Sequence, residues 1–105
     1  MRLENKDYVT LAESVYEIEV EIKNAEGLHM RPAMQFVDLA GKFESDIHVS
    51  NEEQSVDAKS IMQMTMLAAT CGTKLRIKAE GADAAEAIEA LRELVEVKMF
   101  DETPG

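Results

Sequence analysis

The sequence of 105 residues contains little of what usually marks a metalloprotein, a secreted protein or a membrane protein. Cys71 is the single cysteine, so no internal disulfide can form, and no Cys/His spacing typical of a metal site occurs. No apolar run approaches the roughly 18 residues of a membrane span. The first residues are charged where a signal peptide would be apolar. We therefore expect a cytoplasmic protein with no metal, no cofactor and no membrane-spanning segment.

Basic residues are also scarce. Eleven Lys and Arg stand against 21 Asp and Glu, which gives a formal net charge of −10. A chain with this charge is repelled by the phosphates of nucleic acids and by anionic membranes, so we expect neither as a partner. The acids are spread along the chain, which indicates a soluble surface. The length and the apolar content of 46% fit one domain with one modest core.

Alternation of apolar and polar residues predicts four strands. They cover residues 16–23, about 46–50, 55–57 and 74–79. Strands with one wet face indicate an antiparallel sheet. The outward residues of the first strand form an acidic row (Glu17, Glu19, Glu21), and those of the last form a basic row (Lys74, Arg76, Lys78). Opposite charges on neighbouring strands are favourable, so we predict that these two strands pair side by side and antiparallel.

Helical spacing of apolar residues predicts three helices that cover one face of this sheet. The apolar stripe of the first helix consists of Ala33, Phe36, Val37 and Ala40, and Phe43 can extend it. The second helix is expected to run from Ser60 to about residue 69. The third helix is expected to bury Ala84, Ala87, Ile88, Leu91 and Val95. Asp83 resembles the cap of a capping box with Glu86. The order is β-α-β-β-α-β-α, an α+β fold.

The two ends of the chain are expected to lie outside this domain of residues 16–100. In the N-terminal extension 1–15, Tyr8, Leu11, Ala12 and Val15 have a spacing that favours a short helix, although the segment could also be disordered. Residues 101–105 are expected to form a loose tail.

The segment 27–33, GLHMRPA, lies between the first strand and the first helix. A helix start has N–H groups without partners and a partial positive charge, so it suits an anion such as phosphate. His29 places an imidazole there, and Arg31 adds planar donors suited to phosphate oxygens. A neutral imidazole nitrogen is also a nucleophile, so His29 is a candidate to accept a phosphoryl group covalently.

A simpler interpretation makes His29 a loop residue and Arg31 a surface ion-pair partner, because a short His-x-Arg-Pro motif occurs often by chance. His48 falls on the outward face of a strand and is expected to be an ordinary surface histidine. A metal site built from His29, His48 and Cys71 lacks any matched spacing.

The sequence resembles the histidine-containing phosphocarrier protein (HPr) family of the bacterial phosphoenolpyruvate-dependent phosphotransferase system. The resemblance runs from about residue 16 to residue 97 and rests on GLHMRPAMQFV at 27–37, AKSIM at 58–62, CGT at 71–73 and AEGADA at 79–84. The family has an open-faced β-sandwich, a four-stranded antiparallel sheet covered on one face by three helices. The element order derived above matches it.

This resemblance implies roles for individual residues and partners. His29 corresponds to the histidine phosphorylated through Nδ1, and Arg31 to the arginine that supports transfer. Ser60, also a preferred helix cap, corresponds to a serine that a kinase/phosphorylase modifies in some bacteria. Enzyme I would supply the phosphoryl group from phosphoenolpyruvate, enzyme IIA of a sugar system would receive it, and the carrier is expected to be a monomer.

The second helix is expected to dock these partners through apolar residues. The candidates are Ile61, Met62, Met64 and Leu67; the alternative is that all of them belong to the core. Three features depart from the family pattern: bulky Met30 beside the histidine, Glu52-Glu53 at a turn where some relatives have Asn-Gly, and the extension. Two other functions stay open, a regulatory binding module switched at Ser60 without sugar transport, and a sensor for a small anionic ligand.

Overall fold

The computed structural model describes residues 8–12 and 14–105. Its strands are β1 (Tyr8–Ala12), β2 (Val15–Glu21), β3 (Asp46–Ser50), β4 (Ser55–Asp57) and β5 (Lys74–Glu80). Its helices are α1 (Met30–Ala40), α2 (Ile61–Met66) and α3 (Ala84–Arg92), and α3 continues into the π-helical segment η1 (Glu93–Val97) and the 3-10 turn η2 (Met99–Asp101). The four strands and three helices predicted from the sequence are all present.

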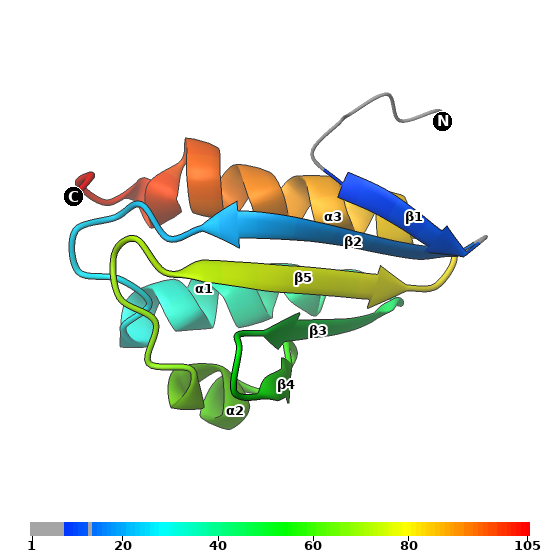
Figure 1. Ribbon diagram of the computed structural model, residues 1–105, viewed down its shortest axis with the longest axis horizontal. Coiled ribbons are helices and arrows are strands. Elements are labelled where there is room, and N and C mark those ends of the chain that lie inside the picture. The colour runs from blue at the N-terminus through cyan, green and yellow to red at the C-terminus, as the bar shows by residue number, and fades with distance from the viewer. Residues whose placement is uncertain (1–7, 13) are drawn as a thin grey trace.

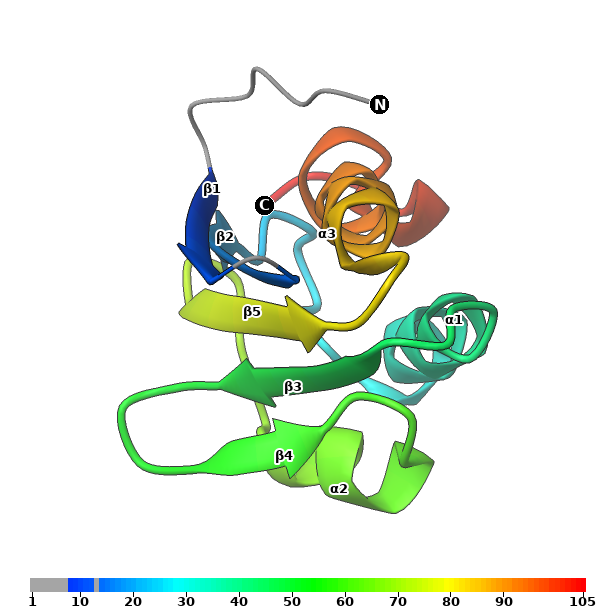
Figure 2. The ribbon, with the colours of Figure 1, turned by 90° about the vertical axis from the view of Figure 1, so that its right-hand side faces the viewer.

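The strands form one antiparallel sheet in the order β1-β2-β5-β3-β4. Figure 2, which views the sheet nearly edge-on, shows the three α-helices on the same side of it. Four of the strands, β2, β5, β3 and β4, with these helices make up the predicted open-faced β-sandwich (Figure 1). The prediction of an α+β fold with one bare sheet face is therefore confirmed.

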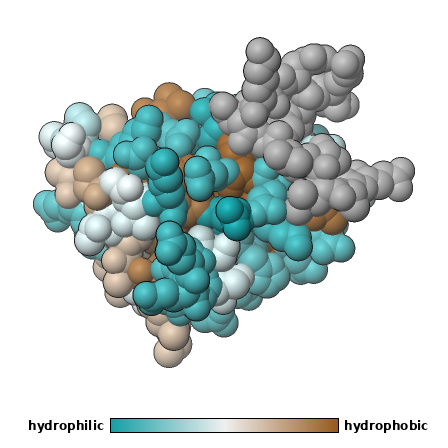
Figure 3. All heavy atoms as spheres, viewed as in Figure 1, coloured by the Kyte–Doolittle hydropathy of each residue, from teal (hydrophilic) through white to brown (hydrophobic). Residues whose placement is uncertain are grey.

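The core lies between the sheet and the helices. The predicted stripes of α1 and α3 supply much of it, and Ala33, Phe36, Ala87, Ile88 and Leu91 are almost completely buried. The bare face of the sheet is largely hydrophilic, as Figure 3 shows, because β2, β3, β4 and β5 place polar residues there. In the described part of the chain, no helix is long and apolar enough to cross a membrane.

The acidic and basic rows face each other across β2 and β5. The register places Glu17 opposite Lys78, Glu19 opposite Arg76 and Glu21 opposite Lys74, as the charges predicted. One ion pair between the rows is diagonal: Arg76 Nε lies 2.7 Å from Glu17 Oε2. Diagonal neighbours on a sheet are within reach of a side chain as long as arginine.

Reversing the whole acidic row to lysine is expected to destabilise the domain, because each of the three new lysines then lies opposite a like charge on β5. Each such pair changes stability by up to about 1 kcal/mol, so the loss is on the order of 2 kcal/mol, or about 10 °C in melting temperature. Thermal unfolding measures it, and reversing the basic row in the same protein is expected to restore part of the loss. The control replaces Glu44, Glu52 and Glu53 with lysine, which changes the net charge by the same amount outside the acidic row. Equal melting temperatures for the two triple variants would contradict a stabilising role of the charge pairing between β2 and β5.

The prediction of a short helix near the N-terminus is wrong for the residues that the structure describes there. Residues 8–12 form β1, which pairs with β2 in a register that places Tyr8 opposite Ile18 and Val9 opposite Glu17. The segment contains the aromatic and β-branched residues that favour strands, and the edge of β2 offers backbone partners that an isolated helix would lack. Residues 1–7 and 13 of the predicted extension lie outside the described residues.

Two further details of the helices differ from the sequence-based prediction. Asp83 precedes α3, but its carboxylate makes no capping bond; it accepts hydrogen bonds from the backbone N–H of Glu44 (2.8 Å) and of Ser45 (3.0 Å) and from the hydroxyl of Ser45. The hydroxyl of Ser45, followed by these N–H groups, holds the pKa of Asp83 below its usual range. The second helix is also shorter than expected, because Ala68, with φ of 48°, leaves the helical conformation.

Candidate functional site

The loop before α1 fixes where His29 stands. Gly27 has φ of +73°, and a Cβ at this position would lie 2.6 Å from the carbonyl oxygen of Ala69, so only glycine fits. The next residue, Leu28, is buried, and its N–H donates to the same carbonyl at 2.8 Å. The loop is thus tied to the segment after α2, and His29 follows directly from two immobilised residues.

His29 is the N-cap of α1, and Pro32 lies in the first turn as predicted. The imidazole makes no capping bond to the helix and is free to face outward; its side chain is 38% exposed. Arg31 stands on the same turn and is largely exposed. The structure therefore confirms the predicted placement of a histidine and an arginine together at the mouth of a helix.

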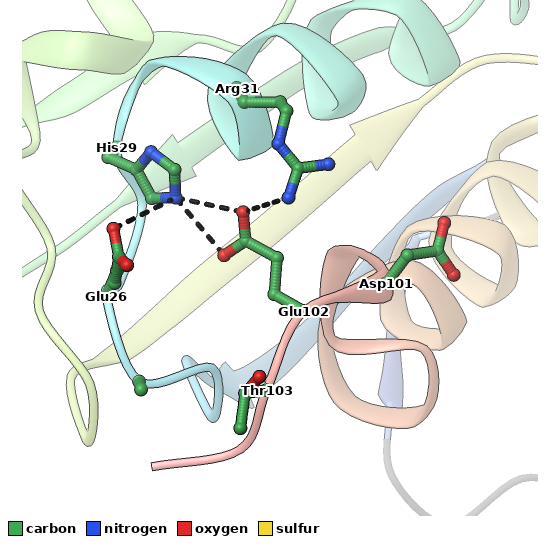
Figure 4. A pocket seen from close by; sticks show the side chains of 7 residues that line it. Glu26, His29, Arg31, Asp101, Glu102 and Thr103 are labelled. Carbon is green, nitrogen blue, oxygen red and sulfur yellow. Dashed lines mark hydrogen bonds and ion pairs between the residues drawn. The ribbon is translucent and has the colours of Figure 1, made fainter.

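The C-terminal segment brings a carboxylate to this pair. Glu102 Oε2 lies 2.9 Å from His29 Nε2 and 2.6 Å from Arg31 Nη2, and Oε1 lies 3.1 Å from the same imidazole nitrogen. Figure 4 shows Glu102 between the two side chains. These residues line a cavity of about 330 Å³ together with Glu26, Asp101, Thr103 and Ala25. The anion expected at the helix mouth is here supplied by the chain itself.

Glu102 carries a negative charge at this site. Its partial burial alone would raise the pKa of the carboxyl group. Hydrogen bonds from Asn24 and His29, with the charge that His29 carries when it is protonated and the charge of Arg31, outweigh burial and hold the pKa of Glu102 below its usual range. The group is therefore a carboxylate at neutral pH and can only accept hydrogen bonds.

This contact decides which nitrogen of His29 is reactive. Because both partners of Nε2 are carboxylate oxygens, Nε2 must carry a hydrogen and donate it. In the neutral ring, Nδ1 then holds the unprotonated lone pair. An unprotonated imidazole nitrogen is a nucleophile. The site therefore presents one nucleophilic nitrogen beside a guanidinium and a helix N-terminus, an arrangement suited to a phosphoryl group.

Residues 101–105 are not the loose tail that the sequence predicted. Besides the contacts of Glu102, the N–H of Ala25 donates to Thr103 O at 2.8 Å, and the N–H of Gly105 donates to Lys23 O at 2.8 Å. Phe100, just before this segment, is completely buried and anchors it. Sequence reasoning missed Glu102, because no motif or spacing links it to a histidine 73 positions away, and it missed Asn24, whose contact with Glu102 spans 78 positions.

Ser60 caps α2 as predicted: its hydroxyl accepts a hydrogen bond from the N–H of Gln63, the third residue of the helix, at 3.2 Å. The docking prediction is only partly compatible with the structure. Met64 and Leu67 are buried in the core and cannot meet a partner, because α2 turns these positions toward the sheet. Ile61 is half-buried against the core, and Met62 is 78% exposed.

Exposed methionines lie on α1, which begins at His29, and on α2, which packs against α1. Met62 and Met66 project from α2, and Met30 and Met34 from the neighbouring α1; all four are at least half exposed. We call these four residues the methionine surface. Thioether side chains are flexible and suit surfaces that meet several partners. His48 is exposed on β3, on the bare face of the sheet, as predicted.

The fold and the site together define an open-faced sandwich that carries a histidine and an arginine at a helix mouth. The family description "PTS HPr component phosphorylation site" matches residues 16–97. The phosphocarrier protein HPr of Pseudomonas aeruginosa is 45% identical over 86 residues, which cover 81% of this chain and 94% of that protein. The chain belongs to the HPr phosphocarrier family of the phosphotransferase system.

Two further relatives agree with this assignment. The phosphocarrier protein HPr of Neisseria meningitidis serogroup A is 42% identical over 76 residues, which cover 72% of this chain and 85% of that protein. The crystal structure of HPr-C-His from Thermoanaerobacter tengcongensis superposes with a TM-score of 0.78 at 46% identity and covers 82% of this chain and 96% of its own. The family match begins after β1, so this strand is an addition to the matched region.

Proposed function

We propose that this chain accepts a phosphoryl group on Nδ1 of His29 from enzyme I and passes it to enzyme IIA of a sugar phosphotransferase system. The observation that carries the proposal is the contact of Nε2 with Glu102, which leaves Nδ1 as the nucleophilic nitrogen. Family membership supplies the chemistry, a phosphoryl group that originates from phosphoenolpyruvate. The carrier works as a monomer in the cytoplasm, where these partners meet it.

The transfer step needs no redox partner. The Nδ1 lone pair attacks phosphorus, the Nδ1–P bond forms, and the bond to the donor breaks with its electron pair leaving on the donor. The hydrogen on Nε2 stays in place, so the ring becomes positive, and the Glu102 carboxylate stabilises that charge at 2.9 Å. Arg31 lies on the same helix turn and pairs with the oxygens of the incoming group. Transfer to the acceptor reverses these events.

The methionine surface, with Ile61, is proposed to dock both partners. It presents exposed apolar side chains on α1, the helix that begins at the histidine, and on α2, which packs against α1. A flexible apolar surface of this kind can accommodate two different proteins in turn. Of the residues first predicted for docking, Ile61 and Met62 remain in this proposal.

The test is incubation with enzyme I and phosphoenolpyruvate, followed by mass spectrometry under alkaline conditions. We expect a mass gain of one phosphoryl group that maps to His29 and is lost in acid, since phosphohistidine is acid-labile. A regulatory module would show no such gain but would bind a partner in a manner controlled at Ser60. A protein that gains no mass with active enzyme I, or gains it elsewhere, is not the carrier proposed here.

A negative charge at Ser60 is expected to slow phosphorylation of His29 without unfolding the domain. Ser60→Asp places charge beside Ile61 and Met62, and burying that charge against an apolar partner is unfavourable. We expect a rate with enzyme I at least about tenfold lower, equivalent to about 1.4 kcal/mol of binding. A serine kinase/phosphorylase would act on this switch in the cell.

Two matched variants separate charge from other effects. Ser60→Ala removes the cap without adding charge and is expected to keep the rate while lowering stability by about 1 kcal/mol. Ser55→Asp adds the same charge on β4, away from both docking helices, and is expected to change neither. A normal rate for Ser60→Asp would leave Ser60 as a helix cap only.

A further inference from the structure

The side chain of Asn24 is buried directly beneath the site. It is completely buried, and its Nδ2 donates to Gly27 O at 2.7 Å and to Glu102 Oε1 at 2.8 Å. Its Oδ1 is also buried and has no hydrogen-bond partner among the described residues. A buried oxygen without a partner costs about 1–3 kcal/mol. This asparagine therefore contributes through its two donors, one of which is aimed at the carboxylate that contacts His29.

The backbone around Asn24 is joined to the C-terminal segment. Asn24 and Pro104 form an isolated antiparallel bridge, and the flanking hydrogen bonds join Ala25 to Thr103 and Lys23 to Gly105. The loop that leads to the histidine and the segment that carries Glu102 are thus held in one register. Figure 4 shows the two segments running beside each other at the cavity.

The chain adopts an unfavourable conformation in order to reach this position. Met99, Phe100 and Asp101 have φ values of 49°, 55° and 59°, although none of them is glycine. A left-handed conformation costs roughly 1–2 kcal/mol for such a residue. Strain of this kind persists where the surrounding structure enforces it, and it is often found at functional sites. Here the strained turn directly precedes Glu102 and is held by buried Phe100.

We propose that Asn24 is a positioning residue for phosphoryl transfer, which acts through Glu102. Its amide holds Oε1, so that the carboxylate keeps contact with Nε2 of His29 and the ring hydrogen stays on that nitrogen. Without the amide, the carboxylate can rotate, the hydrogen can occupy either nitrogen, and Nδ1 is nucleophilic for only part of the time. This inference rests on the proposed function and adds a residue that touches neither the phosphoryl group nor the imidazole.

A double-mutant cycle tests the proposal. Asn24→Ala, Glu102→Ala and the combination are compared for their rate of phosphorylation by enzyme I. We expect each single variant to be slower by about tenfold, the size seen when a group that orients a functional residue is lost. Because Asn24 acts through Glu102, the double variant is expected to be no slower than Glu102→Ala alone. Additive losses would overturn the proposal. A wild-type protein that gains no phosphoryl group would instead defeat the proposed function.

A spectroscopic measurement separates positioning from a merely structural role. The ¹⁵N shifts of His29 report which nitrogen of the neutral ring carries the hydrogen. In the wild type we expect the hydrogen on Nε2. In Asn24→Ala we expect a mixture of two tautomers, with the hydrogen on Nε2 in one and on Nδ1 in the other. Asn51→Ala, which removes an asparagine from the turn between β3 and β4, is the control and is expected to keep the wild-type shifts and rate. Unchanged His29 shifts in a folded Asn24→Ala variant contradict the proposal.

A second measurement keeps the proposal testable if Asn24→Ala fails to fold. In Glu102→Ala, Asn24 is intact but has lost its carboxylate partner. The side-chain amide protons of Asn24 are expected to move upfield relative to the wild type, as a charge-assisted hydrogen bond is removed. An Asn24 amide that does not respond to the loss of Glu102 shows that the two side chains are not coupled, and the proposal is then wrong.

Discussion

Replacing His29 with alanine is expected to abolish phosphoryl acceptance while the domain stays folded. The reaction needs the lone pair of Nδ1, and the other residues that line the cavity in the described structure include no second imidazole. We expect the rate with enzyme I and phosphoenolpyruvate to fall by on the order of 10³-fold or more, as when other catalytic nucleophiles are removed. Mass spectrometry under alkaline conditions measures the loss.

The fold is expected to tolerate this change because His29 lies outside the core. Its side chain is part-exposed, and Glu102 keeps its contacts with Arg31 and Asn24. The loss of stability is therefore about 1 kcal/mol, the value of one hydrogen bond. His48→Ala is the matched control, because it removes the other histidine from the exposed face of β3, and it is expected to react at the normal rate. Normal acceptance by His29→Ala would assign the phosphoryl group to another residue.

Local sequence patterns predicted the fold well, but they did not predict the long-range contacts of the site. Alternation predicted β2 and β5, and the charge rows predicted their pairing, because both follow from residues near one another on a strand. The position of His29 and Arg31 followed from one continuous segment. Glu102 and Asn24 could not be found in this way, because 78 positions separate them in the sequence. They meet through a strained turn and an isolated β-bridge, and neither feature leaves a periodic pattern in the sequence.

The errors have a similar origin. In the N-terminal extension, four residues fit a helical spacing, but pairing with the edge of β2 outweighs this weak preference. The helix α2 has only six residues, so its sequence could not show which of several apolar positions face inward, and Met64 and Leu67 were assigned to the wrong side. The carboxylate of Asp83 binds the loop at Ser45 rather than its own helix, a choice that depends on packing between distant segments.

Arg31→Ala is expected to slow transfer by about 10²-fold, and Arg31→Lys by about tenfold. Removing one preorganised donor from a site of developing negative charge costs roughly 10²–10³ in rate. Lysine keeps the charge but loses the planar fork that binds two oxygens at once. The loss in Arg31→Ala is also increased by Glu102, because its carboxylate, no longer paired at 2.6 Å, repels the incoming phosphoryl group more strongly.

The test compares the rates at which enzyme I phosphorylates the wild type and the two Arg31 variants at several salt concentrations. Lys42→Ala, which removes an exposed positive charge near the other end of α1, is the control. Arg31 is largely exposed and is not part of the core, so neither variant is expected to lower the melting temperature by more than a few degrees. Added salt is expected to slow the wild type and Arg31→Lys but to affect Arg31→Ala less, since exposed charges are screened. Alanine and lysine variants that both react as fast as the wild type would show that neither the planar geometry nor the charge of Arg31 assists the transfer. The guanidinium would then serve only to hold Glu102, a role that the Asn24 amide and the His29 ring already share.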